Sequence, residues 1–201
     1  MPGKYAVAVS LLFCIAALGR QAMVPVVHAG WNEAKAAYEK GDFTKAYEEF
    51  KALAEHGNAD AQWDLGAMYH NGQGVPRDYV EAERWFRRAA EQGIAGAQYN
   101  LGLMYYGGTG VPQDYAEAVK WFSMAAERGV ADAQYVLGVM YLDGIGVPVN
   151  LVQAHVCFNL AAAQGNLEAA TGRDTVAGKM TAAQIAEAQR IAEEWKPKGK
   201  D

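Results

Sequence analysis

Apolar and polar positions follow a helical pattern that recurs along most of the chain. From Ala61 to Tyr69 the apolar residues have the i, i+4, i+7, i+8 spacing of one helix face. The same stretch returns as residues 97–105 and 133–141, each 36 residues further on. A unit of this length cannot bury its apolar face alone, so the pattern predicts repeats that stack on one another. The alanines and glycines on this face are expected to let a neighbouring helix backbone approach closely.

A glycine loop separates two predicted helices in each repeat. The first helix covers about 60–70, 96–106 and 132–142, and the loop reads G-Q-G-V-P, G-T-G-V-P or G-I-G-V-P. The second helix is predicted to begin with a capping box, formed by Asp78 and Glu81, Asp114 and Glu117, and Asn150 and Gln153. It is predicted to end at a glycine that adopts a left-handed conformation, at Gly93, Gly129 and Gly165.

The segments around the repeats divide the chain further. Residues 30–57 keep the register with a shorter turn and are predicted to form an N-terminal helical hairpin of the tetratricopeptide type, which caps the array. The three full repeats are 58–93, 94–129 and 130–165. Residues 166–195 form a degraded fourth repeat, with Arg173 at an apolar position, and a terminal helix from a capping box at Thr181 and Gln184. Residues 196–201 are expected to be a frayed tail.

The first 29 residues have the pattern of a signal peptide. A basic start precedes an apolar run from Tyr5 to Leu18, and Val27-His28-Ala29 resembles a signal-peptidase site. The alternative is an uncleaved membrane anchor, although a helix of that run would span about 21 Å and the hydrocarbon core measures about 30 Å. The sequence therefore predicts cleavage near Ala29 and a periplasmic or secreted protein, in contact with a membrane only if the leader stays attached.

The repeats combine into the pattern A-x-x-x-L-G-x-M-Y-x-x-G-x-G-V-x-x-D-Y-x-x-A-x-x-W-F-x-x-A-A-x-x-G. This pattern resembles the Sel-one-like repeat family, long-looped relatives of the tetratricopeptide repeat. The resemblance covers about residues 57–170. It implies an all-α, right-handed superhelical solenoid of antiparallel helix pairs, and a scaffold or adaptor that binds a protein or peptide partner. Some exported relatives are linked to peptidoglycan-type ligands, so a cell-wall ligand binder or hydrolase is the alternative. This chain lacks their cysteine pairs.

The chemistry available to the chain after the leader is sparse. It has one serine, Ser123, and its three histidines have neither an H-E-x-x-H motif nor paired ligand spacing. Cys157 takes the place of a tryptophan of the repeat and is predicted to be a small buried residue. The net charge of −5 argues against nucleic acid as a partner. The sequence therefore predicts no enzymatic activity, no cofactor and no metal.

The positions that differ between repeats provide the candidate binding site. Invariant positions are expected to be used in packing, namely Leu65, Tyr69, Leu101, Tyr105, Leu137 and Tyr141. The candidate partner-binding residues combine aromatic and polar side chains on another face of the first helices, namely Trp63, Asp64, His70, Tyr99, Asn100 and Tyr106. First helices line the concave side of tetratricopeptide-like stacks, so this face is the predicted groove. The alternative for the aromatic residues is packing between repeats.

Overall fold

The structure of this chain, a computed structural model, describes residues 30–199. Within that range the chain forms α-helices joined by turns and loops, without a β-strand. Residues 30–39 are helical, and the later helices are α2 (Phe43–Glu55), α3 (Ala59–Asn71), α4 (Tyr79–Glu91), α5 (Ala95–Gly107), α6 (Tyr115–Glu127), α7 (Ala131–Asp143), α8 (Leu151–Ala163), α9 (Leu167–Ala177) and α10 (Ala182–Glu194). The predicted leader and its cleavage site lie outside the described residues. Among residues 30–199, no helix is long and apolar enough to cross a membrane.

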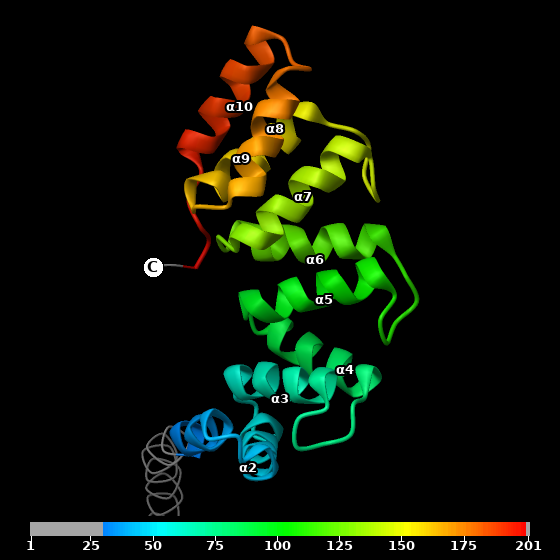
Figure 1. Ribbon diagram of the computed structural model, residues 1–201, viewed down its shortest axis with the longest axis vertical. Helices are drawn as coiled ribbons and strands as arrows, with labels where there is room; N and C mark the ends of the chain where they lie inside the picture. The colour runs from blue at the N-terminus through cyan, green and yellow to red at the C-terminus, as the bar shows by residue number, and fades with distance from the viewer. Residues whose placement is uncertain (1–29, 200–201) are drawn as a thin grey trace, which may run out of the picture.

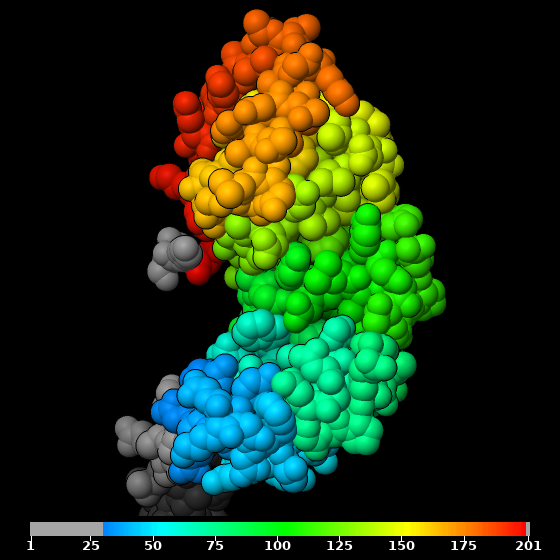
Figure 2. All heavy atoms as spheres, in the orientation of Figure 1, coloured from blue at the N-terminus to red at the C-terminus, as the bar shows by residue number. Residues whose placement is uncertain are grey.

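The helices stack in chain order as antiparallel pairs. α3 packs against α4, α5 against α6 and α7 against α8, while α4–α5 and α6–α7 contacts join one pair to the next. Figure 1 shows a curved column with the N-terminal helices at one end and α10 at the other. In Figure 2 the outline is hollowed on the left, between the cyan spheres of the N-terminal part and the red C-terminal segment. The predicted all-α solenoid of helix pairs is confirmed.

One phenylalanine in each second helix anchors the core. Phe50, Phe86, Phe122 and Phe158 are each no more than 2% exposed. A Cβ atom added to Gly102 would lie 2.5 Å from the Phe122 ring, and Gly66 and Gly138 face their own phenylalanines in the same way. The sequence interpretation of these glycines is therefore corrected, because they admit an aromatic ring of the paired helix and not a neighbouring backbone.

The second glycine of each loop lets one repeat contact the previous one. Gly110 has a φ of 74°, a conformation that strains residues with a side chain. A Cβ atom there would lie 2.6 Å from the carbonyl oxygen of Tyr79, the first residue of α4. Gly74 and Gly146 lie against Phe43 and Tyr115 in the same way. The loop that joins one helix pair is thus seated on the start of the preceding second helix.

The predicted second-helix caps are present, but each capping box is only half formed. The Asp78 carboxylate accepts hydrogen bonds from the amides of Val80 and Glu81, at 2.9 and 3.1 Å. The Asp78 amide donates to the carbonyl oxygen of Tyr69, at 3.0 Å, so the reciprocal bond from Glu81 is replaced. The amides of Asp114 and Asn150 close their loops in the same manner. A complete box forms at Thr181 and Gln184, as predicted.

The C-terminal end departs from the repeat pattern. Arg173 of α9 is half-buried and pairs with the adjacent Asp174 at 2.8 Å. α10 packs against α8, with Ala188 fully buried. We expected residues 196–201 to fray, but over 196–199 the structure places the tail against α6, where the Lys198 amide donates to the carbonyl oxygen of Glu127 at 2.7 Å.

Candidate functional site

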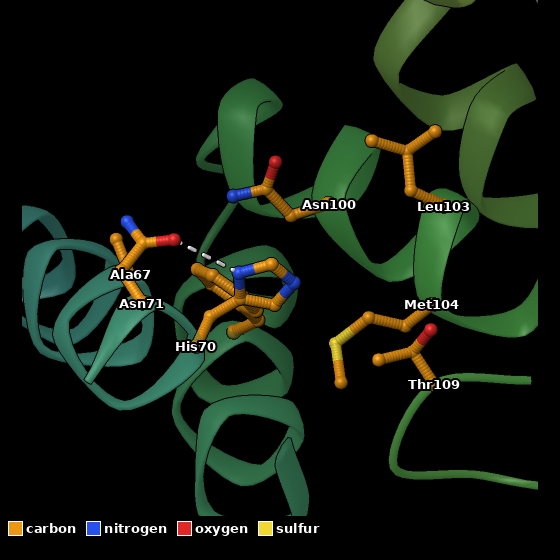
Figure 3. A pocket seen from close by; sticks show the side chains of 8 residues that line it. Ala67, His70, Asn71, Asn100, Leu103, Met104 and Thr109 are labelled. Atoms are coloured by element: carbon orange, nitrogen blue, oxygen red, sulfur yellow. Dashed lines mark hydrogen bonds between the residues drawn. The ribbon is translucent and has the colours of Figure 1, made fainter. Parts of the chain in front are cut away.

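A cavity of about 250 Å³ lies between the first helices of two adjacent repeats. Its polar side chains come from the end of α3, from the middle of α5 and from the loop that follows α5. The lining residues are Ala67, His70, Asn71, Phe86, Asn100, Leu103, Met104 and Thr109. Figure 3 shows the His70 ring and the Asn100 carboxamide on facing helices, with Leu103 beyond them. The cavity therefore contains two residues of the first-helix face that the sequence predicted as a groove, His70 and Asn100.

The polar groups at the cavity differ in how far their hydrogen bonding is satisfied. The His70 Nδ1 atom lies 3.1 Å from the Asn71 side-chain oxygen, and the Asn71 amide donates to Gln73 at 3.3 Å. The Asn100 side chain is half-buried and has no hydrogen-bond partner among the described residues. Leu103, one turn further along α5, is 42% exposed. A free carboxamide thus stands beside an exposed apolar side chain.

Two of the predicted aromatic residues pack toward the next repeat. The half-buried Trp63 ring lies against the core cluster of the second repeat, and a Cβ atom on Gly96 would be 2.7 Å from it. The Tyr99 ring lies with its centroid 5.7 Å from that of Phe122 in its own repeat, and it packs on a core cluster that also contains Ala133 and Leu137 of the next repeat. Neither residue lines the cavity. These contacts favour packing between repeats for both rings.

The other two predicted residues are also engaged in the fold. Asp64 pairs with Lys35 of the N-terminal hairpin at 3.5 Å, and burial raises the pKa of its carboxyl group while Lys35 lowers it. The Tyr106 ring packs edge-on against Tyr115 at 5.3 Å, just as His70 packs against the first residue of α4. Of the six predicted residues, the cavity brings together His70 and Asn100.

The predicted site residues did not include Leu103, Asn71 and Thr109, which line the cavity. Leu103 does occupy a position that differs between repeats, with Ala67 and Val139 as its equivalents, and such positions are the basis of the predicted groove. Asn71 and Thr109 lie where a helix ends and a loop begins. Their position at the cavity depends on how adjacent repeats are packed, which periodicity along one helix does not describe.

Buried glutamines form a further feature that the sequence did not single out. The side-chain amides of Gln62, Gln98 and Gln134 each donate at 3.1 Å to a carbonyl oxygen near the end of the preceding second helix, in Ala54, Ala90 and Ala126. Gln92 and Gln164 donate in turn to Gln62 and Gln134. Each of these carbonyl groups also accepts from a backbone amide of the following turn, in Gly57, Gly93 and Gly129, so the glutamines add a second hydrogen bond at the end of the helix.

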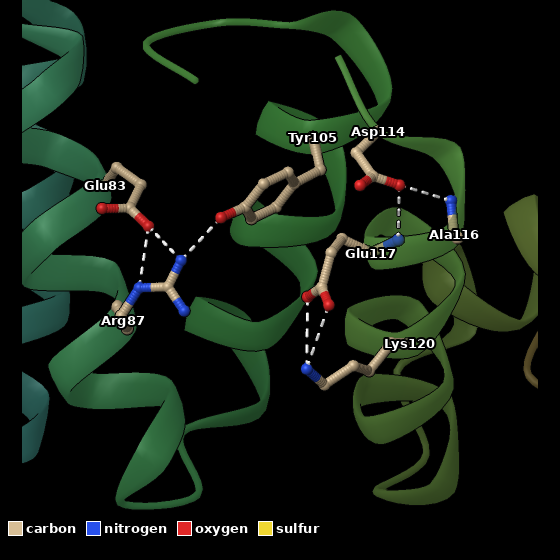
Figure 4. Close-up of polar contacts among 7 residues, drawn as sticks. All are labelled: Glu83, Arg87, Tyr105, Asp114, Ala116, Glu117 and Lys120. Carbon is tan, nitrogen blue, oxygen red and sulfur yellow. Dashed lines mark hydrogen bonds and ion pairs between the residues drawn. The ribbon is translucent and has the colours of Figure 1, made fainter. Parts of the chain in front are cut away.

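Arg87 on α4 links the first full repeat to the second (Figure 4). Its guanidinium donates to Glu83 in its own helix and, at 2.6 Å, to the hydroxyl of Tyr105 on α5. On α6, Glu117 pairs with Lys120 at 3.2 Å. Each charge is used in a contact within the scaffold, so this network does not form a convergent catalytic set.

Two further reactive side chains, Cys157 and His155, are withdrawn from solvent. Burial raises the pKa of the Cys157 thiol to about 12, which keeps it protonated and confirms the prediction of a buried residue. His155 is 3% exposed, and burial, assisted by Arg173, lowers its pKa. In the part of the chain that the structure describes, no group of three histidine, cysteine or acidic residues could hold a metal ion.

The repeats match a known family model in register. The model of the Sel1 repeat matches residues 59–94, 95–130 and 131–166, more than half of the chain. The chain belongs to the Sel1 repeat family. Sel1 repeats are typically scaffolds for protein interactions and are generally non-catalytic. A search of curated proteins found no match to this chain.

Solved structures support the same assignment. A protective antigen present in uropathogenic Escherichia coli strains, which displays an SLR fold, is 39% identical with a TM-score of 0.69, over 77% of this chain and 34% of that one. A Sel1 repeat protein from Oxalobacter formigenes is 34% identical with a TM-score of 0.66, over 70% of this chain and 56% of that one. The Helicobacter pylori cysteine rich protein B, 21% identical with a TM-score of 0.50 over 62% of this chain and 95% of that one, shares the fold. This chain spans about a third and about half of the first two proteins.

Proposed function

We propose that this protein is an exported, non-enzymatic scaffold that binds an extended peptide segment of a partner protein on the face of α3, α5 and α7. The observation that carries the proposal is the cavity between α3 and α5, where Asn100 has a free carboxamide beside the exposed Leu103. A carboxamide pairs with a peptide backbone through its donor and its acceptor, and the apolar lining accepts one side chain. The cavity is smaller than the roughly 300–1,000 Å³ of a typical small-molecule site.

The experiment is a selection of peptides from a phage-displayed library on the purified chain, followed by affinity measurements on single peptides. We expect the double variant Asn100→Ala, Leu103→Ala to bind the selected peptides at least tenfold more weakly. The variant lacks the carboxamide that pairs with the peptide backbone and the apolar side chain that contacts a peptide side chain. The variant should stay folded, because Leu103 is exposed.

A matched control uses two exposed residues of the second helix, Val80→Ala and Arg84→Ala. This pair changes one apolar and one polar side chain, as the test pair does. Equal affinity of the control and the wild type supports the groove. Unchanged affinity in the Asn100, Leu103 variant, or an equal loss in the control, contradicts it.

Export is a separate part of the proposal and rests on residues 1–29. We expect the protein recovered from its native host to begin at or near Gly30 and to fractionate with the periplasm or the medium. Sequencing of the N-terminus checks this. A product that retains Met1 in the cytoplasm contradicts export and leaves the peptide groove unaffected.

A further inference from the structure

The buried glutamines of α3, α5 and α7 differ in one respect. The side-chain oxygen of Gln62 accepts a hydrogen bond from Gln92 at 2.7 Å, and that of Gln134 accepts one from Gln164 at 2.8 Å. The side-chain oxygen of Gln98 is fully buried and has no hydrogen-bond partner in the part of the chain that the structure describes. Because a buried acceptor without a partner destabilises a fold, this exception needs a physical reason.

The reason is a substitution at one position of the repeat. Gln92 and Gln164 stand 36 residues before and after residue 128, which is an arginine. Arg128 directly follows the end of α6, as Gln92 follows the end of α4. Its Nη2 atom lies 2.8 Å from the place where a Gly93 side chain would begin. Arg128 thus holds the position of the missing donor, but its guanidinium rests against the Gly93 turn and does not bond Gln98.

The C-terminal tail contacts the same guanidinium. The Nη1 atom of Arg128 lies 2.9 Å from the place where a Gly199 side chain would begin. The Lys198 amide donates to the Glu127 carbonyl oxygen at 2.7 Å, and the Lys198 ammonium lies 2.8 Å from the Glu127 carboxylate. Figure 1 shows the chain after α10 running back to the level of α6. The guanidinium is therefore in contact with two glycines, one from the preceding repeat and one from the tail.

Gln98 lies beside the turn that Arg128 contacts. The Gln98 side-chain amide and the Gly93 backbone amide both donate to the carbonyl oxygen of Ala90, at 3.1 and 3.0 Å. An arginine side chain has several rotatable bonds and several donors in a fork. A change of rotamer therefore brings an Arg128 donor to the Gln98 oxygen.

We propose that Arg128, Lys198 and Gly199 form a latch with two positions. In the closed position, which the structure shows, the tail end holds Arg128 against the Gly93 turn. In the open position Lys198 and Gly199 leave Glu127, and Arg128 turns and donates to the side-chain oxygen of Gln98. Arg128 then does for Gln98 what the glutamines at the equivalent position do for the other two repeats.

The bonds exchanged between the two positions are similar in strength. Opening breaks an exposed ion pair of Lys198 with Glu127, which contributes little, and one backbone hydrogen bond. It forms one charge-assisted hydrogen bond from Arg128 to a buried acceptor. The tail end is therefore a strap that opens while the repeats stay folded. The latch uses none of the residues that line the cavity.

The first test measures exchange of the Lys198 amide proton with solvent by NMR on the full ¹⁵N-labelled chain. Gln98→Met removes the acceptor of the open position, so the closed position gains and the exchange should slow about threefold or more. Gln62→Met is the matched control, because it removes the equivalent glutamine where nothing lies within 4 Å of the Gly57 side-chain position. It should leave the Lys198 exchange rate unchanged. An unchanged or faster rate in Gln98→Met, or the same slowing in both variants, overturns the proposal.

The Gln98→Met variant should stay folded. Methionine is close to glutamine in volume, and the Ala90 carbonyl oxygen keeps the Gly93 amide as its donor. The amide spectrum of the variant checks this directly.

A second variant opens the latch from the side of the tail. Lys198→Glu places a carboxylate against that of Glu127, and Gly199→Ala adds a methyl group 2.9 Å from Arg128 at a φ of 80° that favours glycine. The two changes combined should release the tail end without loss of the fold, because both residues are exposed. Faster exchange of the amide proton at position 198 verifies the release.

The side-chain amide signals of the buried glutamines report where Arg128 goes. On release of the tail end we expect the Gln98 signals to shift, because the Gln98 oxygen now accepts a hydrogen bond, and the Gln62 signals to stay. With Arg128→Ala in the background, the same release should leave the Gln98 signals in place. Gln98 signals that stay at the wild-type position after release, or that shift equally without Arg128, overturn the proposal.

Discussion

Leu101 and Leu103 are two positions apart in α5, yet their surroundings assign them opposite roles. Leu101 is fully buried in the core of the second repeat, whereas Leu103 is 42% exposed at the cavity. We expect Leu101→Ala to lower the free energy of unfolding by about 2–5 kcal/mol, the cost of an emptied core site. Leu103→Ala should lower it by less than about 1 kcal/mol, since little buried area is lost. Urea denaturation of both variants checks the contrast, and equal costs contradict it.

Gly102 allows a test in which the usual effect of a substitution is reversed. In most helices, glycine to alanine stabilises by about 1 kcal/mol. Here the new methyl group would lie 2.5 Å from the Phe122 ring, so Gly102→Ala should destabilise by about 1–3 kcal/mol. The smaller side chain in Phe122→Leu should reduce the extra cost when the two are combined. A thermodynamic double-mutant cycle measures this coupling. Additive effects would show that the Phe122 ring is not the reason why position 102 needs a glycine.

At the scale of the element, the start of α6 distinguishes the two halves of a capping box. The Asp114 carboxylate accepts from the amides of Ala116 and Glu117, at 2.9 and 3.0 Å. We therefore expect Asp114→Ala to cost about 1 kcal/mol of unfolding free energy. Glu117→Ala should cost less than about 0.5 kcal/mol, because Glu117 makes an exposed pair with Lys120 and does not cap the helix. Chemical denaturation checks both, and a larger loss for Glu117→Ala would show that the Glu117 side chain does cap the helix.

At the scale of the whole molecule, His155 sets a pH dependence for the C-terminal end. It is buried in α8, and its pKa in the native state lies below the ordinary value of 6.5 because of burial and the nearby Arg173. As the pH falls through about 6.5, His155 becomes protonated in the unfolded chain but not yet in the native state. Protonation therefore favours the unfolded chain, and the free energy of unfolding falls. Above it, the effect is absent.

We expect the wild type to lose stability more steeply between pH 7.5 and 5.5 than the variant His155→Gln. Urea denaturation at both pH values gives the two slopes. The comparison uses the change with pH in each protein, so any fixed cost of the substitution cancels. Identical slopes would show that His155 titrates alike in the folded and unfolded states.

The sequence by itself determined the repeat architecture. The 36-residue recurrence of Leu65, Leu101 and Leu137 placed the buried face, because helical spacing and a stacked repeat leave few other ways to bury those side chains. The caps at Asp78 and Asp114 were equally readable, since they depend on contacts within three residues. Both features depend on residues that are close in the sequence or recur at a fixed spacing, so the sequence alone predicts them.

Only the tertiary structure decided how one repeat meets the next. The candidate site shows this in Trp63, Tyr99 and Asn100, which share a predicted face although two pack toward the next repeat and one lines the cavity. Tyr99 and Asn100 are adjacent in α5, yet one side chain packs on a core cluster and the other lines the cavity. Which of the two a side chain does depends on how neighbouring repeats pack. The tail contact between Lys198 and Glu127 joins residues 71 positions apart. No local pattern encodes such a pair, because it forms only when α10 has packed on α8 and the chain after α10 has returned to α6.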